Sequence, residues 1–201
     1  MSEAPTRRHG RRRPLLPAYP SATEMDAMLD AADNPRNWLL VYLVWVTGAR
    51  ISEALAARVG DLTPNGVRLL NEKQGGHAEK HVYVPGPALA RLREAVAGLP
   101  TTAFLFTPLS GERPTPISRQ QGYNVVTRIA RLAGVFKLKH GIRRPAWPHS
   151  IRHAYAVHLI NSAVPLNAVQ DQLGHSDLES TAVYLRLADP DRERAIGGVK
   201  F

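Results

Sequence analysis

Residues 47–53 read Thr-Gly-Ala-Arg-Ile-Ser-Glu, and they join two segments whose apolar residues recur at helical spacing. The preceding segment, residues 36–47, is apolar on almost all sides, which is typical of a buried helix. The following segment, residues 51–58, has its apolar residues on one side. Because glycine readily adopts the left-handed backbone that ends a helix, we expect Gly48 to turn the chain sharply and to place Arg50 at the start of the second helix.

On the N-terminal side, Ser21 and Glu24 form a capping-box pattern that predicts the start of the first helix. Residues 1–20 before it combine prolines with a cluster of basic residues, which favours a flexible arm. The candidate DNA-binding residues of this arm are Arg7, Arg8, Arg11, Arg12 and Arg13. A solvated tail and an arm lying on phosphates both remain open. The second alternative would be excluded if deletion of residues 1–13 changed neither DNA affinity nor its salt dependence.

On the C-terminal side, the pattern changes to the alternation of a β-hairpin. Asn65-Gly66 is a turn signal, residues 67–70 and 81–84 carry the strand-like residues, and the polar segment between them includes Gly75-Gly76. Residues 104–106 fit either a short strand or a buried loop. Helical spacing resumes at residues 87–97, 117–133, 149–162, 165–173 and 179–187. The sequence shows no internal repeat or second-domain boundary, so we expect an α+β fold, mostly α, with a small antiparallel β-sheet.

The composition narrows the class of protein. The 201 residues are 44% hydrophobic and carry a net charge of +9, with a pI of about 10.3, a balance that suits a polyanionic partner such as DNA. There are no cysteines, which excludes disulfides and cysteine-based chemistry. No apolar run approaches the roughly 20 residues of a membrane span, and no apolar core follows the basic N-terminus as in a secretory signal. A cytoplasmic protein without a membrane partner is the simplest interpretation.

Four segments carry residues suited to cutting a phosphodiester bond without a metal ion. They contribute Arg50, then Lys73 on the hairpin, then the pair His149 and Arg152, and finally His175 with Tyr184 nine residues later. Residues three apart on a helix share a face, so His149 and Arg152 lie together. An arginine fork binds phosphate oxygens in pairs, and a phenolate can attack phosphorus to form a reversible ester.

The ordered set Thr-Gly-x-Arg-x-Ser-Glu, hairpin lysine, His-x-x-Arg-His, Leu-Gly-His and distal tyrosine resembles the tyrosine recombinase (phage integrase) family over roughly residues 20–190. The resemblance implies a catalytic domain at residues 21–190 and six catalytic residues: Arg50, Lys73, His149, Arg152, His175 and Tyr184. It implies that Arg50 and Arg152 clamp the scissile phosphate. His149 and His175 would hydrogen-bond the same phosphate and help proton transfer.

The resemblance also implies that Tyr184 forms a 3′-phosphotyrosyl bond while Lys73 protonates the leaving 5′-oxygen. Lys80, seven residues further on, is the alternative general acid, although the family's spacing favours Lys73. Glu53 and His153 match supporting positions of the motifs. Without the flanking pattern, Tyr184 would be interpreted as a core tyrosine, because it lies among apolar residues. No cofactor is implied, because the covalent ester stores the energy of the broken bond.

A metal site at the histidine pair is the alternative use of His149 and His153, which are four residues apart. Zinc proteases place a glutamate directly after the first histidine, whereas this chain has Ser150 there and offers no evident third ligand. A type IB topoisomerase, which reseals the same strand, and a non-catalytic DNA-binding accessory protein are the alternative functions. The Leu-Gly-His element favours a recombinase that integrates, resolves or inverts DNA, and the complete active-site set disfavours a pure binder.

The chain departs from the family at its N-terminal side. Most members carry a separate helical domain that closes around DNA, whereas about 20 residues precede the expected catalytic fold here. A truncated sequence and a minimal member of the family, such as a fimbrial phase-switch recombinase or a plasmid or transposon resolvase, both account for this. Family tails dock on neighbouring protomers, so we expect residues 191–201 to do so in a homotetramer on double-stranded DNA with a specific recombination site.

Overall fold

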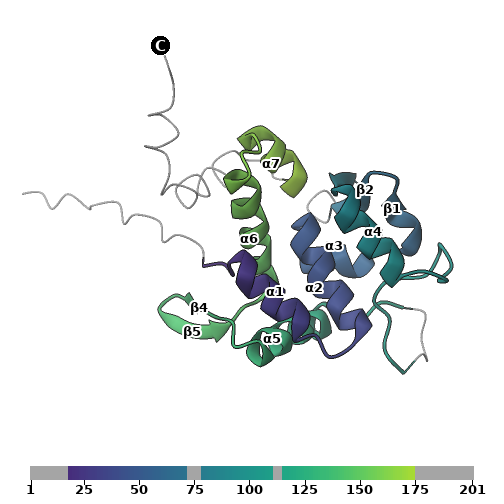
Figure 1. Ribbon diagram of the computed structural model, residues 1–201. Helices are drawn as coiled ribbons and strands as arrows, with labels where there is room; N and C mark the ends of the chain where they lie inside the picture. The colour runs from purple at the N-terminus through teal and green to yellow at the C-terminus, as the bar shows by residue number, and fades with distance from the viewer. Residues whose placement is uncertain (1–17, 72–77, 111–114, 175–201) are drawn as a thin grey trace, which may run out of the picture.

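A computed structural model describes residues 18–71, 78–110 and 115–174 (Figure 1). Several features that the sequence analysis singled out therefore lie outside the described residues: the arginine cluster at residues 7–13, Lys73, His175, Tyr184, the expected helix at 179–187 and the tail at 191–201. No helix in the described ranges is long and apolar enough to cross a membrane.

The described elements follow one another in the order α1 (Ala22–Asp30), α2 (Pro35–Thr47), α3 (Ile51–Ala56), η1 (Val59–Asp61), β1 (Leu62–Thr63), β2 (Gly66–Asn71), β3 (Ala78–Tyr83), α4 (Gly86–Ala95), α5 (Arg119–Leu132), β4 (Phe136–Lys139), β5 (Ile142–Pro145), α6 (Pro148–Asn161) and α7 (Leu166–Leu173). The expected mostly helical α+β fold with a small antiparallel sheet is confirmed. The predicted capping box of the first helix is present, since Glu24 N donates to Ser21 Oγ and Ser21 N donates to the Glu24 carboxylate.

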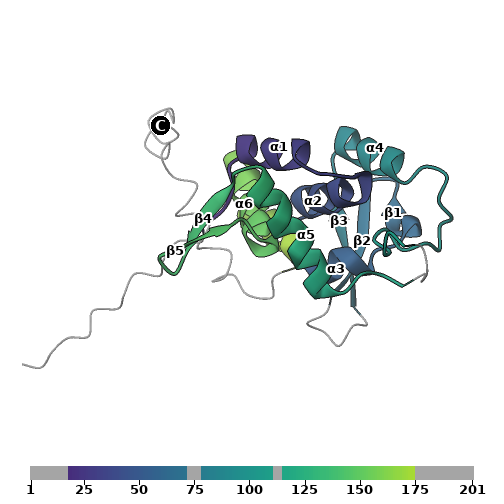
Figure 2. The same ribbon diagram turned by 90° about the horizontal axis from the view of Figure 1, so that it is seen from below.

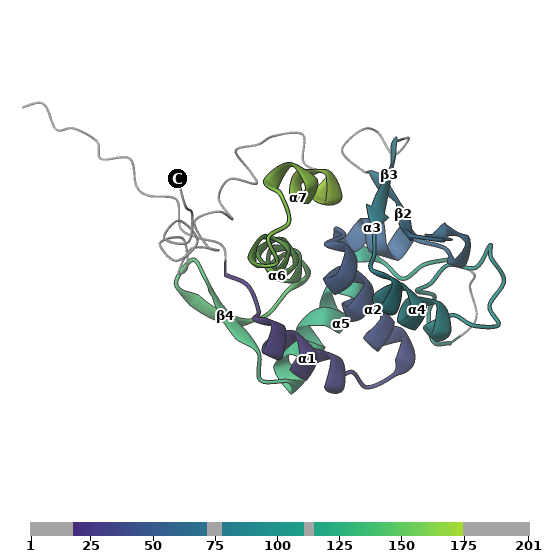
Figure 3. The ribbon, with the colours of Figure 1, turned by 45° about the horizontal axis from the view of Figure 1, so that its top comes forward.

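Helix α2 is the centre of the helical layer, as its apolar sequence predicts. It lies among the other helices (Figure 3) and contacts α1, α3, α4, α5 and α6, and most of its side chains are buried. Asn34 caps its first turn, and Gly48 ends it in the left-handed conformation with φ of 60°. The motif at residues 47–53 therefore starts from the best-packed part of the fold.

The sheet has the order β1-β2-β3, and both pairings are antiparallel. Val67 pairs with Val82 and Leu69 pairs with Lys80, so these four residues share one face of the sheet. Val67, Leu69 and Val82 are buried on that face. Because helix α7 contacts strand β3, the sheet connects the α2–α3 region to the last described helix.

A second hairpin, β4–β5, was absent from our expectations. It projects from the helical body on the side away from the β1–β3 sheet (Figures 1 and 2). Its two-residue turn, His140-Gly141, has φ of 51° and 76°, which is the geometry of a tight hairpin turn that follows the twist of the strands. A strand is usually recognised in a sequence by alternating apolar and polar residues, because one of its faces is buried and the other is solvated. The apolar residues Leu138 and Ile142 are exposed in this hairpin, so that signal is missing.

For residues 104–106, the sequence left a short strand and a buried loop as alternatives. These residues form a buried loop rather than a strand of a sheet, with a single antiparallel bridge between Phe104 and Arg58. The Arg58 guanidinium lies 3.6 Å from the centre of the Phe104 ring. Helix α3 ends at Ala56, two residues earlier than expected, because Ala57 is already extended and hydrogen-bonds this loop.

Candidate active site

The turn at Gly48 places the first predicted catalytic residue. A Cβ atom on Gly48 would lie 2.3 Å from Cδ1 of Tyr155, whose buried ring packs against the turn. The side chain of Thr47 donates to Leu43 O at 2.6 Å and accepts from Ala49 N at 3.2 Å. The backbone is thus fixed on both sides of the glycine, and Arg50 follows as the N-cap residue of α3.

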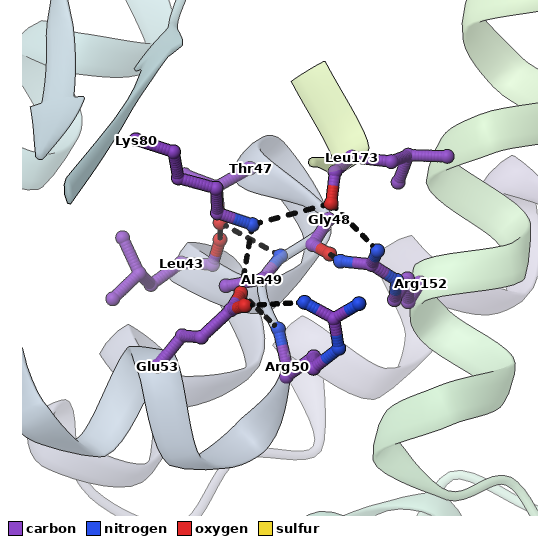
Figure 4. A network of polar contacts seen from close by, with 9 residues as sticks. All are labelled: Leu43, Thr47, Gly48, Ala49, Arg50, Glu53, Lys80, Arg152 and Leu173. Atoms are coloured by element: carbon purple, nitrogen blue, oxygen red, sulfur yellow. Dashed lines mark hydrogen bonds and ion pairs between the residues drawn. The ribbon is translucent and has the colours of Figure 1, made fainter. Parts of the chain in front are cut away.

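Glu53 holds Arg50 in two ways (Figure 4). Its Oε2 accepts from the backbone N–H of Arg50 at 2.9 Å, and its Oε1 accepts from Arg50 Nη1 at 2.6 Å. The Glu53 side chain is fully buried, whereas 16% of the Arg50 side chain is exposed. The supporting role expected for Glu53 therefore has a concrete form, since the carboxylate orients the guanidinium that reaches the surface.

Lys80 completes this group from strand β3. Its Nζ lies 2.8 Å from Glu53 Oε2 and 3.4 Å from Leu173 O, and only 9% of its side chain is exposed. Burial lowers the pKa of the Lys80 ammonium, and the neighbouring Glu53 carboxylate offsets part of that effect. Burial alone would raise the pKa of Glu53, but Lys80 and Arg50 keep it below its ordinary value. The Glu53 carboxylate is therefore ionised at neutral pH, and its negative charge favours the ammonium form of Lys80.

Arg152 lies on α6 and is 2% exposed. Its Nη1 donates to Gly48 O at 2.6 Å and its Nη2 donates to Leu173 O at 2.7 Å, so it joins the end of α2 and the end of α7. In Figure 4 the guanidinium of Arg50 is directed toward the side on which Arg152 lies. The site thus gathers three basic side chains in one network of contacts: Arg50 and Lys80 contact the Glu53 carboxylate, and Arg152 shares the Leu173 carbonyl with Lys80.

His149 lies at the start of α6, one residue after Pro148. It lines a cavity of about 720 Å³ between α5, the β4–β5 hairpin and α6, together with Arg119, Tyr123, Lys139, Trp147 and His153. The rings of His149 and His153 meet edge to face, with centroids 5.4 Å apart. Loss of surrounding water and the charges of Arg152 and Arg50 lower the pKa of His149. This histidine is therefore neutral at neutral pH and can share a proton with a phosphate oxygen.

The structure brings together Arg50, Glu53 and Arg152 as the motifs predict, with His149 close enough for both arginines to affect its pKa. Lys73, His175 and Tyr184 lie outside the described residues, so their assignments remain predictions. No group of three potential metal ligands occurs within the described ranges.

Sequence reasoning treated Lys80 only as a rival general acid and missed its contact with Glu53. The signal was available in the alternation of β3. Val82 and Val84 are buried even-numbered residues, and a strand alternates its side chains, so Lys80 belongs to the same inward face. The roles of the Gly48 and Leu173 carbonyls were not predictable. Every residue has a backbone carbonyl, so the sequence does not show which of them accept hydrogen bonds from side chains.

Comparison with known proteins identifies the class to which this fold and site belong. The chain matches the phage integrase family over residues 21–190. It is 28% identical to a tyrosine recombinase of Pseudothermotoga lettingae over 186 residues, covering 90% of this chain and 60% of the relative. It is 33% identical to a resolvase of Escherichia coli over 195 residues, covering 86% of this chain and 74% of the relative. The chain belongs to the phage integrase family.

Solved structures share the fold. The catalytic domain of bacteriophage HP1 integrase matches with a TM-score of 0.62 at 23% identity, covering 90% of this chain and 94% of that domain. The XerH site-specific recombinase bound to a palindromic difH substrate, in its post-cleavage complex, matches with a TM-score of 0.68 at 23% identity, covering 91% of this chain and 53% of XerH. The chain spans about 60% of the length of the first curated relatives that it matches.

The buried Glu53 carboxylate predicts a pH-dependent contribution to stability. Because its pKa is lower in the folded chain, this contribution is complete above the ordinary value of 4.5 and is lost as the pH falls through the folded-state pKa. Glu53→Gln leaves Arg50 and Lys80 without their counter-charge and is expected to lower the free energy of unfolding by about 3 kcal/mol at pH 7. Urea denaturation between pH 3.5 and 7 should show this difference shrinking at the acidic end.

Glu24→Gln is the matched control for this prediction. Glu24 also caps a helix and pairs with a lysine, Lys137, but about a third of its side chain is exposed. A solvent-screened pair of this kind contributes less than about 1 kcal/mol. A Glu53→Gln effect that stays constant across the pH range would contradict the assignment of a charged, buried Glu53.

Proposed function

We propose that this chain is the catalytic part of a site-specific DNA recombinase that cuts and rejoins strands through a 3′-phosphotyrosyl intermediate. The observation that carries the proposal is the network that joins Arg50, Lys80 and Arg152 through one buried carboxylate, that of Glu53, and one backbone carbonyl, that of Leu173. Glu53 neutralises only part of this positive charge, and an anion placed between Arg50 and Arg152 would neutralise more. A phosphodiester that gains charge on its equatorial oxygens during cleavage fits this arrangement.

In the proposed reaction, the Tyr184 hydroxyl gives its proton to a neutral histidine of the site, its oxygen attacks the scissile phosphorus, and the bond from phosphorus to the 5′-oxygen breaks. Arg50 and Arg152 stabilise the equatorial oxygens, and neutral His149 hydrogen-bonds one of them. The leaving 5′-oxygen takes a proton from Lys73, and His175 completes the set of phosphate ligands. Attack by a 5′-hydroxyl of a second duplex then releases the tyrosine and exchanges the strands.

The partners that follow from this proposal are double-stranded DNA with a recombination site and further copies of the chain on that DNA. Exchange between two duplexes needs four cleavages, which a tetramer supplies. The basic arm, with its five arginines at positions 7–13, would add phosphate contacts. The relatives named as a tyrosine recombinase and a resolvase support this proposal over DNA relaxation.

A nicked suicide substrate tests the proposed function. In such a DNA, cleavage releases a short strand that diffuses away, so the covalent complex accumulates. The substrate is a library of nicked sites, because the target sequence is unidentified. We expect a protein–DNA adduct in denaturing gels, with the DNA remnant on the peptide that contains Tyr184 by mass spectrometry and no adduct with Tyr184→Phe. An adduct that persists in the phenylalanine variant would assign another nucleophile, and no adduct with any site would leave only DNA binding.

A further inference from the structure

Only 9% of the Lys80 side chain is exposed, and burial of an ammonium is costly unless it is paired. Two acceptors on different elements meet its Nζ: Glu53 Oε2 on α3 at 2.8 Å and the Leu173 carbonyl at the end of α7 at 3.4 Å. A lysine on strand β3 therefore connects two helices, and both contacts lead to an arginine of the proposed phosphate clamp.

The first contact leads to Arg50 through Glu53. The carboxylate oxygen that contacts Lys80 also accepts the backbone N–H of Arg50, and the second oxygen accepts Arg50 Nη1. Without Lys80, the whole negative charge of a buried carboxylate would act on Arg50 alone. The guanidinium would then be drawn toward Glu53 and away from an incoming phosphate.

The second contact leads to Arg152 through a shared carbonyl. Leu173 O accepts from Arg152 Nη2 at 2.7 Å and from Lys80 Nζ at 3.4 Å (Figure 4). Arg152 reaches this carbonyl from α6, and Lys80 reaches it from β3. The two donors approach from different elements, so together they restrict where the end of α7 can lie. That position in turn determines the direction in which the Arg152 guanidinium points.

We propose that Lys80 is a positioning residue for DNA cleavage, which sets Arg50 through Glu53 and Arg152 through the Leu173 carbonyl and does not itself protonate the leaving group. This inference rests on the proposed function and deepens it. A general acid must place its proton within hydrogen-bond reach of the leaving oxygen. Lys80 instead directs its ammonium to Glu53 and Leu173, with the carboxylate between it and the Arg50 guanidinium. The assignment leaves Lys73 as the proton donor.

Two substrates separate positioning from proton donation. One is the nicked suicide DNA, and the other carries sulfur in place of the bridging 5′-oxygen at the scissile phosphate. The sulfur leaves as a thiolate without needing a proton, because a thiol is far more acidic than an alcohol. A variant that lacks the general acid therefore recovers on the sulfur substrate, whereas a variant with a misplaced clamp does not.

For Lys80→Met, which keeps the length of the side chain but removes its charge, we expect adduct formation to slow about 30-fold, as for a small displacement of catalytic groups. DNA affinity should change less than about threefold, since the phosphate backbone contacts remain. The defect should persist on the sulfur substrate, while the defect of Lys73→Met should largely disappear.

In a Glu53→Gln background, Lys80→Met should slow adduct formation by less than about threefold, because the two residues act in one chain of contacts.

Lys137→Met is the matched control, since Lys137 also forms an ion pair with a glutamate, Glu24, but on strand β4. Lys80→Arg keeps a cation beside Glu53 and should cleave at least about tenfold faster than Lys80→Met, even if the methionine variant loses thermal stability.

Three results would overturn the inference: recovery of Lys80→Met on the sulfur substrate, undiminished cleavage by Lys80→Met, or an arginine variant that folds but cleaves no faster than the methionine variant. Absence of an adduct with the wild-type chain would instead contradict the proposed function.

Discussion

Arg50→Lys is expected to slow adduct formation about a thousandfold, the largest loss we predict for a single substitution at a described residue. Lysine keeps the charge and can still pair with Glu53, so the buried carboxylate does not lose its counter-charge. It lacks the planar fork that contacts Glu53 with one nitrogen while presenting others to a phosphate. The single-turnover rate on the nicked suicide substrate measures this effect, and the thermal midpoint verifies that the variant is folded.

Arg128→Lys is the matched control for this substitution. Arg128 also pairs with a carboxylate, that of Asp33, but the pair joins α5 to the loop after α1 and is partly exposed. We expect its cleavage rate to stay within about twofold of the wild-type rate, as for an exposed ion pair. A rate for Arg50→Lys within tenfold of the wild type would mean that Arg50 supplies only charge and is not a bidentate clamp.

Gly48→Ala is expected to destabilise the fold by about 3 kcal/mol, so cleavage should fall with the folded fraction at temperatures near the lowered midpoint. Two costs combine at this position. The left-handed φ of 60° is unfavourable for alanine, and the new Cβ would lie 2.3 Å from the ring of Tyr155 and 3.0 Å from Leu173 Cδ2. The ring cannot move aside cheaply, because it is packed in the small cluster between α6 and α7.

Gly134→Ala separates these two costs. Gly134 follows α5 with φ of 69°, and nothing lies within 4 Å of a Cβ built there. We expect only the backbone cost of about 1 kcal/mol at this glycine. Chemical denaturation of both variants measures the difference, which reports the contact with Tyr155. Equal losses for the two glycines would show that the packing at Gly48 adapts and that the turn is not sterically fixed.

Much of the fold follows from local patterns in the sequence. The capping box at Ser21, the apolar run of α2 and the glycines after α2 and α7 each act within a few residues, so they identify elements correctly before any tertiary contact is known. The β4–β5 hairpin escaped prediction because its apolar residues Leu138 and Ile142 are exposed and its turn relies on a histidine with positive φ. That conformation is less common for histidine than for glycine or asparagine.

The sequence predicted the site residues whose chemistry depends on the type of side chain. It did not predict the contacts that depend on how the chain folds. Arg50 and Arg152 lie 102 positions apart, yet their motifs assign them to one phosphate, and Figure 4 places both at the same group of contacts. The partner of Glu53 depends on which face of β3 turns inward, a tertiary property that alternation only suggests. The cavity beside His149 depends on the unexpected hairpin, so nothing in the motif could indicate its other lining residues.

The surplus of positive charge around Glu53 links ion binding to folding. Arg50, Lys80 and Arg152 lie in one network of contacts that holds one carboxylate, that of Glu53, so the folded chain holds like charges together that the unfolded chain separates. Any small dianion that binds the folded state more tightly than the unfolded chain stabilises the fold, and the stabilisation increases with the ratio of its concentration to its Kd. Sulfate and inorganic phosphate should therefore both protect the domain against heat and compete with DNA for it. A buffer that stabilises the protein with sulfate or phosphate would therefore also inhibit DNA cleavage, because the anion occupies the site that binds the DNA phosphate.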